Sequence, residues 1–284
     1  MIKDIYQQRA REIRFFWKIT VTIILTLLLI VISRSGLIFL VQQVFILLGT
    51  PSSIAFENAQ IFVAESPEGQ AIASSLDVLL ILALIFVSVT RIERREFHLA
   101  DIGLGMHRNT LPLVALGLAI GCSLFLGAVV FGVLIDTQEL PMFPNIVMWP
   151  PLNTLFTSII FYFLNGFWQE IVFRGYLQTR AVEEYGRLFG ILTVTVVFVI
   201  LHGLVQTITP MGVISGLLLF SFIGLLYEKT KSLYLVSVIH AGLNFLPILF
   251  NILWQGLETV ITYCIALMLL ILVIHRAEQK PTSL

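Results

Sequence analysis

The stretch that decides the fold is LFTSIIFYFLNGFWQEIVFRGYL, residues 155–177, in which a long apolar run leads directly into charged side chains. An ionised side chain at bilayer depth costs roughly 2.5–3.5 kcal/mol on insertion scales. Charged residues in such a segment are therefore expected to have a use. If the stretch is helical, Glu170 and Arg174 lie on one face with the acid first, the favourable order for an ion pair. Gln169 then points about 100° away around the helix axis.

The overall composition indicates a membrane protein. Of 284 residues, 58% are hydrophobic and 12% are charged, whereas roughly 25% are charged in soluble domains. Lys plus Arg and Asp plus Glu number 17 each, so no net charge favours nucleic acid as a partner. Cys122 and Cys264 lie in apolar runs and are predicted to be packing residues rather than a disulfide.

The predicted fold class is all-α: a polytopic membrane protein with about eight transmembrane helices. Lipid admits only helices or closed barrels, and the apolar runs are too long for strands. Residues 37–49 are long enough only for a partial segment and are predicted not to cross. A crossing there would place the basic cluster at residues 91–95 outside, against the positive-inside rule. Crossings are expected at about 15–33, 76–89, 111–135, from 152 into the central motif, 188–204, 211–227, 233–250 and 260–274.

We expect one membrane domain, because no internal repeat, low-complexity segment or linker divides the chain. Its parts are a lead with the first three spans (1–150), a core that carries the polar motifs (151–250), and the last span with a tail (251–284). The basic residues of the lead, of the loops and of the tail fall on one side if both termini are cytoplasmic.

Two histidines inside apolar runs add to the polar set. His202 follows Phe198 by four residues, and His240 precedes Asn244 by four. For either histidine alone, a side chain satisfied by a neighbouring helix is an equal alternative. Together with the charged pair of the central motif they favour a buried polar site among spans 4, 5 and 7.

Hydrolysis inside a membrane requires a water activated by a base and donors for the oxyanion that forms. A carboxylate and a neutral imidazole can supply the first, and a second imidazole with a carboxamide can supply the second. Glu170 or its neighbour, His202, His240 and Asn244 form that set. Arg174 would stabilise the charge of Glu170, so a structural role for this pair stays open.

These residues resemble the motifs of a known family. Gln169-Glu170-x-x-x-Arg174, Phe198-x-x-x-His202 and His240-x-x-x-Asn244 look like the three motifs of the CPBP family, also called ABI. Its members include type II CAAX prenyl endopeptidases and bacteriocin self-immunity proteins. The similarity covers about residues 151–250 in the right order.

The resemblance implies an all-helical intramembrane endopeptidase acting on a peptide or membrane-protein substrate. The first glutamate of the motif and His202 would activate water, while His240 and Asn244 would stabilise the oxyanion. Members are often called metalloendopeptidases, so a divalent metal such as zinc is a candidate cofactor, with Glu170, His202 and His240 as candidate ligands. Size and family also suit a bacterial inner membrane.

One position departs from the family pattern. The motif opens with two glutamates, but this chain has Gln169 and then Glu170, and a carboxamide cannot take a proton from water at neutral pH. Three explanations are open. Glu170 or His202 carries the base role; the chain is a natural non-proteolytic member, such as a regulator or immunity-type protein; or Gln169 is an engineered inactivating change.

The depth of the motifs within their spans presents a second difficulty. Counting about 1.5 Å per residue places Gln169 near the cytoplasmic end of span 4 but His202 beyond the middle of span 5. Irregular backbone at membrane depth is allowed where it lines a protein cavity. We therefore expect either wrong boundaries or a bend near Gly175.

Overall fold

The computed structural model describes residues 2–137, 150–252 and 256–279, with side chains from residue 16 onward. All regular elements in these ranges are helices, so the all-α prediction is confirmed. The chain divides into two compact units. The first comprises Met1–Asp101 with Pro150–Val172, and the second comprises Ile102–Trp149 with Phe173–Leu284.

The first unit is built around α3, which packs against α1, α2 and α5. The start of α3 follows from its sequence: Ser66 accepts a hydrogen bond from the Gly69 amide at 3.0 Å, and Pro67 occupies the first turn. Both residues are favoured there because the first turn leaves amides unpaired. The helices are α1 (Ile2–Leu47), α2 (Ser52–Glu65), α3 (Pro67–Val87) with a π-helical turn (Ser88–Ile92), and α5 (Leu152–Glu170).

The first helix is longer than the sequence indicated. It continues to Leu47, so residues 37–49 are largely its last turns and not a separate crossing, and the predicted end at residue 33 was wrong. Arg34 had marked the apparent end of the apolar run. Arg34 forms an ion pair within the first unit, because its Nη2 donates to Asp77 Oδ2 at 3.0 Å.

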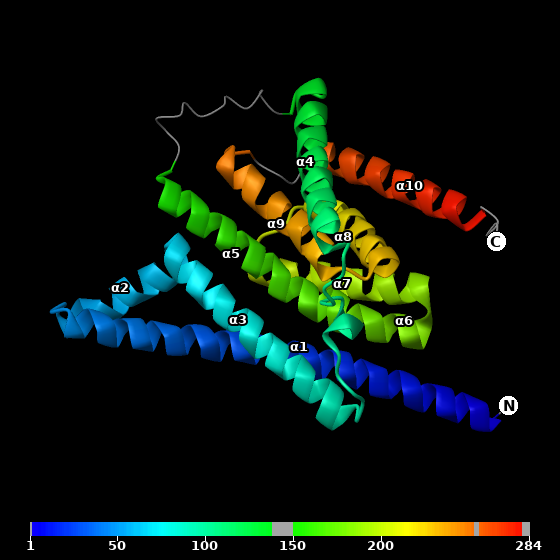
Figure 1. Cartoon of the computed structure of the whole chain (residues 1–284), viewed down its shortest axis with the longest axis horizontal. Helices are drawn as coiled ribbons and strands as arrows, with labels where there is room; N and C mark the ends of the chain where they lie inside the picture. Colours follow the sequence, from blue (N-terminus) through cyan, green and yellow to red (C-terminus); the bar gives the residue numbers. More distant parts are fainter. Residues whose placement is uncertain (1, 138–149, 253–255, 280–284) are drawn as a thin grey trace. The chain divides into compact units, whose positions relative to one another are not determined.

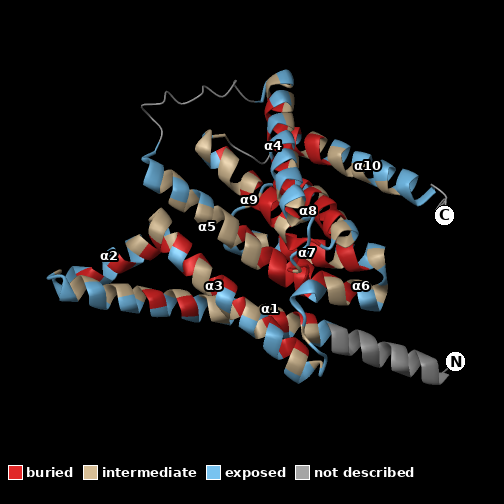
Figure 2. Cartoon of the chain, viewed as in Figure 1, coloured by how far each residue is buried: buried red, intermediate tan, exposed pale blue. Residues whose placement is uncertain are grey.

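In the second unit, α8 packs against α7, α9 and α10, and α4 packs against α9 and α10. Gly117 of α4 permits the closest approach, since a Cβ there would stand 2.8 Å from the Leu235 carbonyl oxygen. Buried residues concentrate where α7, α8 and α9 meet (Figure 2). The helices are α4 (Thr110–Leu134), α6 (Thr179–Tyr185), α7 (Arg187–Val205), α8 (Pro210–Thr230), α9 (Leu233–Leu249) and α10 (Leu257–Gln279).

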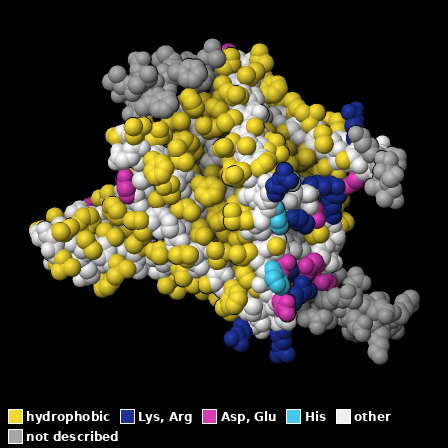
Figure 3. Space-filling view, in the orientation of Figure 1, with side chains coloured by type: hydrophobic (Ala, Val, Ile, Leu, Met, Phe, Trp, Pro, Cys, Tyr) yellow, Lys and Arg dark blue, Asp and Glu magenta, His cyan; other side chains and the backbone are white. Residues whose placement is uncertain are grey.

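Within the ranges that the structure describes, eight apolar helices correspond to the eight predicted crossings. Seven are long and apolar enough to span a bilayer, and α9 is a shorter apolar helix of 17 residues. Hydrophobic side chains cover most of the visible face (Figure 3), as a lipid-contacting surface requires. The seven longer spans are Phe16–Leu47, Pro67–Ile92, Thr110–Leu134, Leu152–Tyr185, Arg187–Val205, Pro210–Thr230 and Leu257–Gln279.

The fourth span explains the apparent difference in depth. Helix α5 continues through a π-helical segment, Ile171–Gln178, into α6, so the helical stretch ends only at Tyr185. Gln169 therefore lies near the middle of the span, and its predicted boundary was wrong by more than a turn. The expected bend is a π-helix instead, and the chain turns at Gly186, whose φ of 77° suits glycine.

Candidate active site

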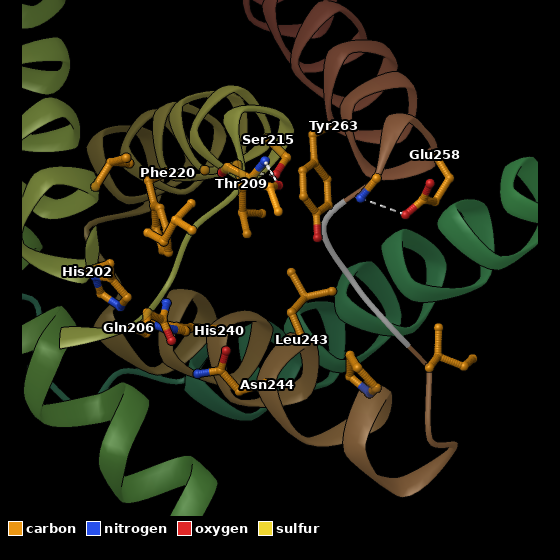
Figure 4. A pocket seen from close by; sticks show the side chains of 18 of the residues that line it. His202, Gln206, Thr209, Ser215, Phe220, His240, Leu243, Asn244, Glu258 and Tyr263 are labelled. Atoms are coloured by element: carbon orange, nitrogen blue, oxygen red, sulfur yellow. Dashed lines mark hydrogen bonds between the residues drawn. The ribbon is translucent and has the colours of Figure 1, made fainter. Parts of the chain in front are cut away.

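A cavity of about 770 Å³ lies within the second unit, lined by α7, α8, α9 and the start of α10. Figure 4 shows four polar side chains together on one side of it: His202, Gln206, His240 and Asn244. Glu258 lies on the opposite side. Both intramembrane histidines and the carboxamide that follows one of them thus share a single hollow.

His202 lies three residues before the end of α7 and is half-buried. Its Nδ1 is 3.0 Å from the carbonyl oxygen of Phe198, one turn earlier. A carbonyl oxygen can only accept, so in the neutral imidazole this contact favours a proton on Nδ1 and leaves Nε2 as the acceptor. This is the tautomer that a general base requires at Nε2.

His240 and Asn244 lie one turn apart on α9, whose first turn is held by the Ser232 side chain accepting from the Leu235 amide. His240 is 2% exposed, whereas Asn244 is half-buried. Residues four apart share a helix face, which is why both side chains line the cavity. An imidazole N–H and a carboxamide N–H can together donate to one developing negative oxygen.

Two buried phenylalanine rings set the positions of both imidazoles. The Phe198 and Phe220 ring centroids are 4.1 Å apart. The His202 ring lies 4.2 Å from Phe198 and 5.9 Å from Phe220, and the His240 ring lies 5.9 Å and 5.5 Å from the same two rings. Phe220, on α8, carries no sequence signal of its own, because it is an ordinary apolar residue between two motifs.

Arg174 supports this aromatic pair from the π-helical segment. It is fully buried, and its Nη2 donates to the Phe220 carbonyl oxygen at 3.1 Å. Its Cζ lies 5.0 Å from the Phe198 ring centroid and 5.3 Å from that of Phe220. One turn later, Gln178 Nε2 donates to the Gly224 carbonyl oxygen at 2.8 Å. Sequence reasoning missed Gln178, although a glutamine four residues after Arg174 was a visible signal.

Gln169 and Glu170 end α5 and belong to the first unit. Gln169 is 8% exposed and Glu170 is 0% exposed. Of the residues singled out from the sequence, the second unit brings His202, His240 and Asn244 to the cavity, with Arg174 and Phe198 behind them. Gln206, one turn after His202, also lines the cavity and was missed.

The predicted metal has no ready set of ligands in the described ranges. Within them, no three His, Cys, Asp or Glu side chains form a group that could hold an ion. His202 also directs Nδ1 to a main-chain carbonyl. The metal stays a prediction, and no step below passes through it.

Residues 151–246 match the model of a protein family described as type II CAAX prenyl endopeptidase Rce1-like. The match covers about one third of the chain and contains all three motifs. This segment is therefore similar to that family, as the motifs predicted, and a CAAX-type protease is the activity that the similarity supports. No curated protein matches the chain.

Proposed function

We propose that this protein, with its Rce1-like segment, is an intramembrane endopeptidase that hydrolyses peptide bonds of membrane-associated substrates. The observation that carries the proposal is the shared cavity, in which His202, His240 and Asn244 meet. Two imidazoles and a carboxamide at one hollow supply both proton transfer and oxyanion binding.

In the proposed reaction, a water loses its proton to Nε2 of His202 and attacks the scissile carbonyl carbon. The carbonyl oxygen becomes an oxyanion that accepts hydrogen bonds from His240 and Asn244. When the carbon–nitrogen bond breaks, the protonated base returns its proton to the leaving amine. The products are one carboxylic acid terminus and one amine terminus.

The supporting residues act by restricting motion. Phe198 and Phe220 hold both rings, and Arg174 fixes Phe220 through its main chain. Catalytic side chains are effective when neighbouring contacts preset their geometry, because less ordering is then needed during the reaction.

The orientation that we propose follows from charge. The ends of the second-unit helices far from the cavity carry Arg187, Lys229 and Arg276, and Glu278 binds both Arg187 and Lys229. By the positive-inside rule these ends face the cytoplasm. The C-terminal end of α10 is then cytoplasmic, and the basic residues of the lead favour a cytoplasmic N-terminus as well. We take the membrane to be the bacterial inner membrane, and the cavity then lies in its outer half.

The alternative is a catalytically inactive homologue that binds peptides as a membrane regulator or bacteriocin-immunity type protein. Gln169 is the observation that favours it, because the usual first glutamate of the motif is absent. The same residue would appear in an engineered Glu-to-Gln form.

The test is cleavage of membrane-tethered peptides by the purified protein and by its Gln169→Glu variant. Hydrolysis by both shows that residue 169 is not the base and supports His202 in that role. Hydrolysis by the variant alone supports the inactive alternative, and no hydrolysis by either removes the endopeptidase proposal. The His240→Ala variant should abolish any turnover, and unchanged turnover would remove its oxyanion role.

A further inference from the structure

The side of the cavity opposite His202 contains a carboxylate for which the proposed reaction has no use. Glu258 lies in the first turn of α10, outside the Rce1-like segment, and lines the cavity (Figure 4). It is only 2% exposed. A buried ionisable group in a membrane protein is retained at a cost and therefore calls for a partner.

A helix-capping role accounts for only part of this side chain. Glu258 Oε1 accepts from the Gly256 amide at 2.9 Å, and an acidic residue in a first turn also suits the helix dipole. Oε2 is 3.5 Å from the Thr137 hydroxyl, which is the long limit for a hydrogen bond. Neither of these two neighbours is charged.

The ion pairs of the described part of the chain do not include this carboxylate, since they involve other acids. The whole sequence also has no Lys or Arg between Arg108 and Arg174, between Arg187 and Lys229, or between Lys231 and Arg276. The helices that form the cavity walls thus carry their basic residues only toward their far ends.

We propose that Glu258 is a subsite for a cationic group of the ligand, either a Lys or Arg side chain or a free amine. The carboxylate of Glu258 keeps acceptor capacity for an ammonium or guanidinium. Oε1 accepts only one main-chain N–H, and Oε2 has only a distant hydroxyl nearby. The cavity volume falls within the range of about 300–1,000 Å³ typical of ligand sites. The ligand then spans from Glu258 to the His202 side.

This subsite deepens the proposed function and rests on it for the nature of the ligand. If the ligand is a peptide to be cut, its scissile bond lies at His202, His240 and Asn244 while its cation lies at Glu258. The enzyme then selects substrates that carry a positive charge at a fixed number of residues from the cleaved bond. Charge selection arises because a neutral residue leaves the carboxylate unpaired.

The experiment measures binding of dye-labelled, membrane-tethered peptides to the full chain by fluorescence anisotropy. The two peptides of each pair differ at one position, which is Lys in one and acetyl-lysine in the other. From pair to pair this position is moved along the peptide. At one position we expect the Lys peptide to bind about tenfold more tightly, since a paired buried charge is commonly worth that much. Glu258→Gln should reduce the difference to less than twofold while keeping an acceptor for the Gly256 amide.

Glu68→Gln is the matched control, because Glu68 is also an acid in the first turn of a helix. It should leave the tenfold preference unchanged. The subsite is overturned if wild type shows no Lys preference at any position, a result that needs no variant to fold. A preference that survives in Glu258→Gln overturns it as well.

Hydrolysis is followed in the same mixtures and judges the proposed function separately. Charge-selective binding without hydrolysis retains the subsite and removes the endopeptidase. Hydrolysis without charge selection retains the endopeptidase and removes the subsite.

Discussion

Arg174 donates from Nη2 to the main-chain carbonyl oxygen of Phe220 at 3.1 Å, which ties the π-helical segment to the middle of α8. The same carbonyl belongs to the residue whose ring contacts both His202 and His240. The arginine of the first motif therefore reaches the third motif through a residue that belongs to none of the motifs, and it contacts the second motif directly at Phe198 as well. Because Phe220 has a main-chain contact and a ring contact, its position is fixed at both ends.

We expect Arg174→Lys to lower stability and activity together. Lysine retains the charge, but it lacks the planar group that lies against Phe198 and Phe220. A lost hydrogen bond to a charged donor lowers the free energy of unfolding by about 1.5–3 kcal/mol. Detergent-based unfolding measures this, with the exposed Arg276→Lys as the control. An unchanged unfolding curve would show that Arg174 does not support the aromatic pair.

The two sides of the proposed chemistry should respond differently to substitution. His202→Gln removes a candidate base and should lower kcat by roughly 10²–10⁴-fold. Asn244→Asp replaces donors with a negative charge beside the expected oxyanion and should lower kcat by at least roughly 10²–10³-fold, with little effect on KM. Steady-state cleavage assays measure both. A change confined to KM would mean that Asn244 binds substrate instead.

The contact between α4 and α9 predicts a glycine-specific effect. Gly117→Ala would place a methyl group 2.8 Å from the Leu235 carbonyl oxygen, and overpacking of this kind costs about 1–3 kcal/mol of unfolding free energy. Gly242→Ala on α9 is the control, because a methyl group there would meet no atom within 4 Å among the residues that the structure describes. It should leave stability unchanged or raise it. Equal effects of both substitutions would contradict close packing at Gly117.

The ion pair of the first unit predicts an asymmetry. The Asp77 side chain is 0% exposed and that of Arg34 is 32% exposed. Arg34→Met leaves a buried carboxylate without its cation and should cost close to 3 kcal/mol, the low end of the roughly 3–5 kcal/mol range for broken buried pairs. Asp77→Asn should cost less, because an amide oxygen still accepts from Arg34. A double-mutant cycle measures the coupling free energy between Arg34 and Asp77. A value near zero would mean that the pair contributes no more than a solvent-exposed ion pair.

The proposed orientation predicts which helix ends reach each side of the membrane. In a chain with Cys122 and Cys264 replaced by Ala, Gln206→Cys should react with a membrane-impermeant maleimide on intact bacteria. Arg276→Cys should react only after permeabilisation, because the basic ends face the cytoplasm. The opposite labelling pattern would reverse the orientation and move the cavity to the inner half.

The sequence alone determined the helical membrane fold and the order of the eight apolar helices in the described ranges. It did so because long apolar runs in lipid have only one unbroken hydrogen-bonded form, and because basic loops constrain how such runs alternate. It also picked out Arg174, His202, His240 and Asn244, since polar residues at four-residue spacing stand out in apolar helices, and Phe198 through the resemblance to the family motif.

Only the tertiary structure decided helix ends and the residues that join the motifs. The first crossing was predicted to end at residue 33, just before Arg34, whose partner Asp77 lies 43 residues away in the sequence. Phe220 is one of 22 phenylalanines, and nothing local distinguishes it until α8 places its ring in contact with both imidazoles. Glu258 lies just before the last predicted crossing and was not singled out from the sequence, and only the fold sets it in the wall of the cavity. Each of these depends on contacts between distant segments, which a one-dimensional pattern does not contain.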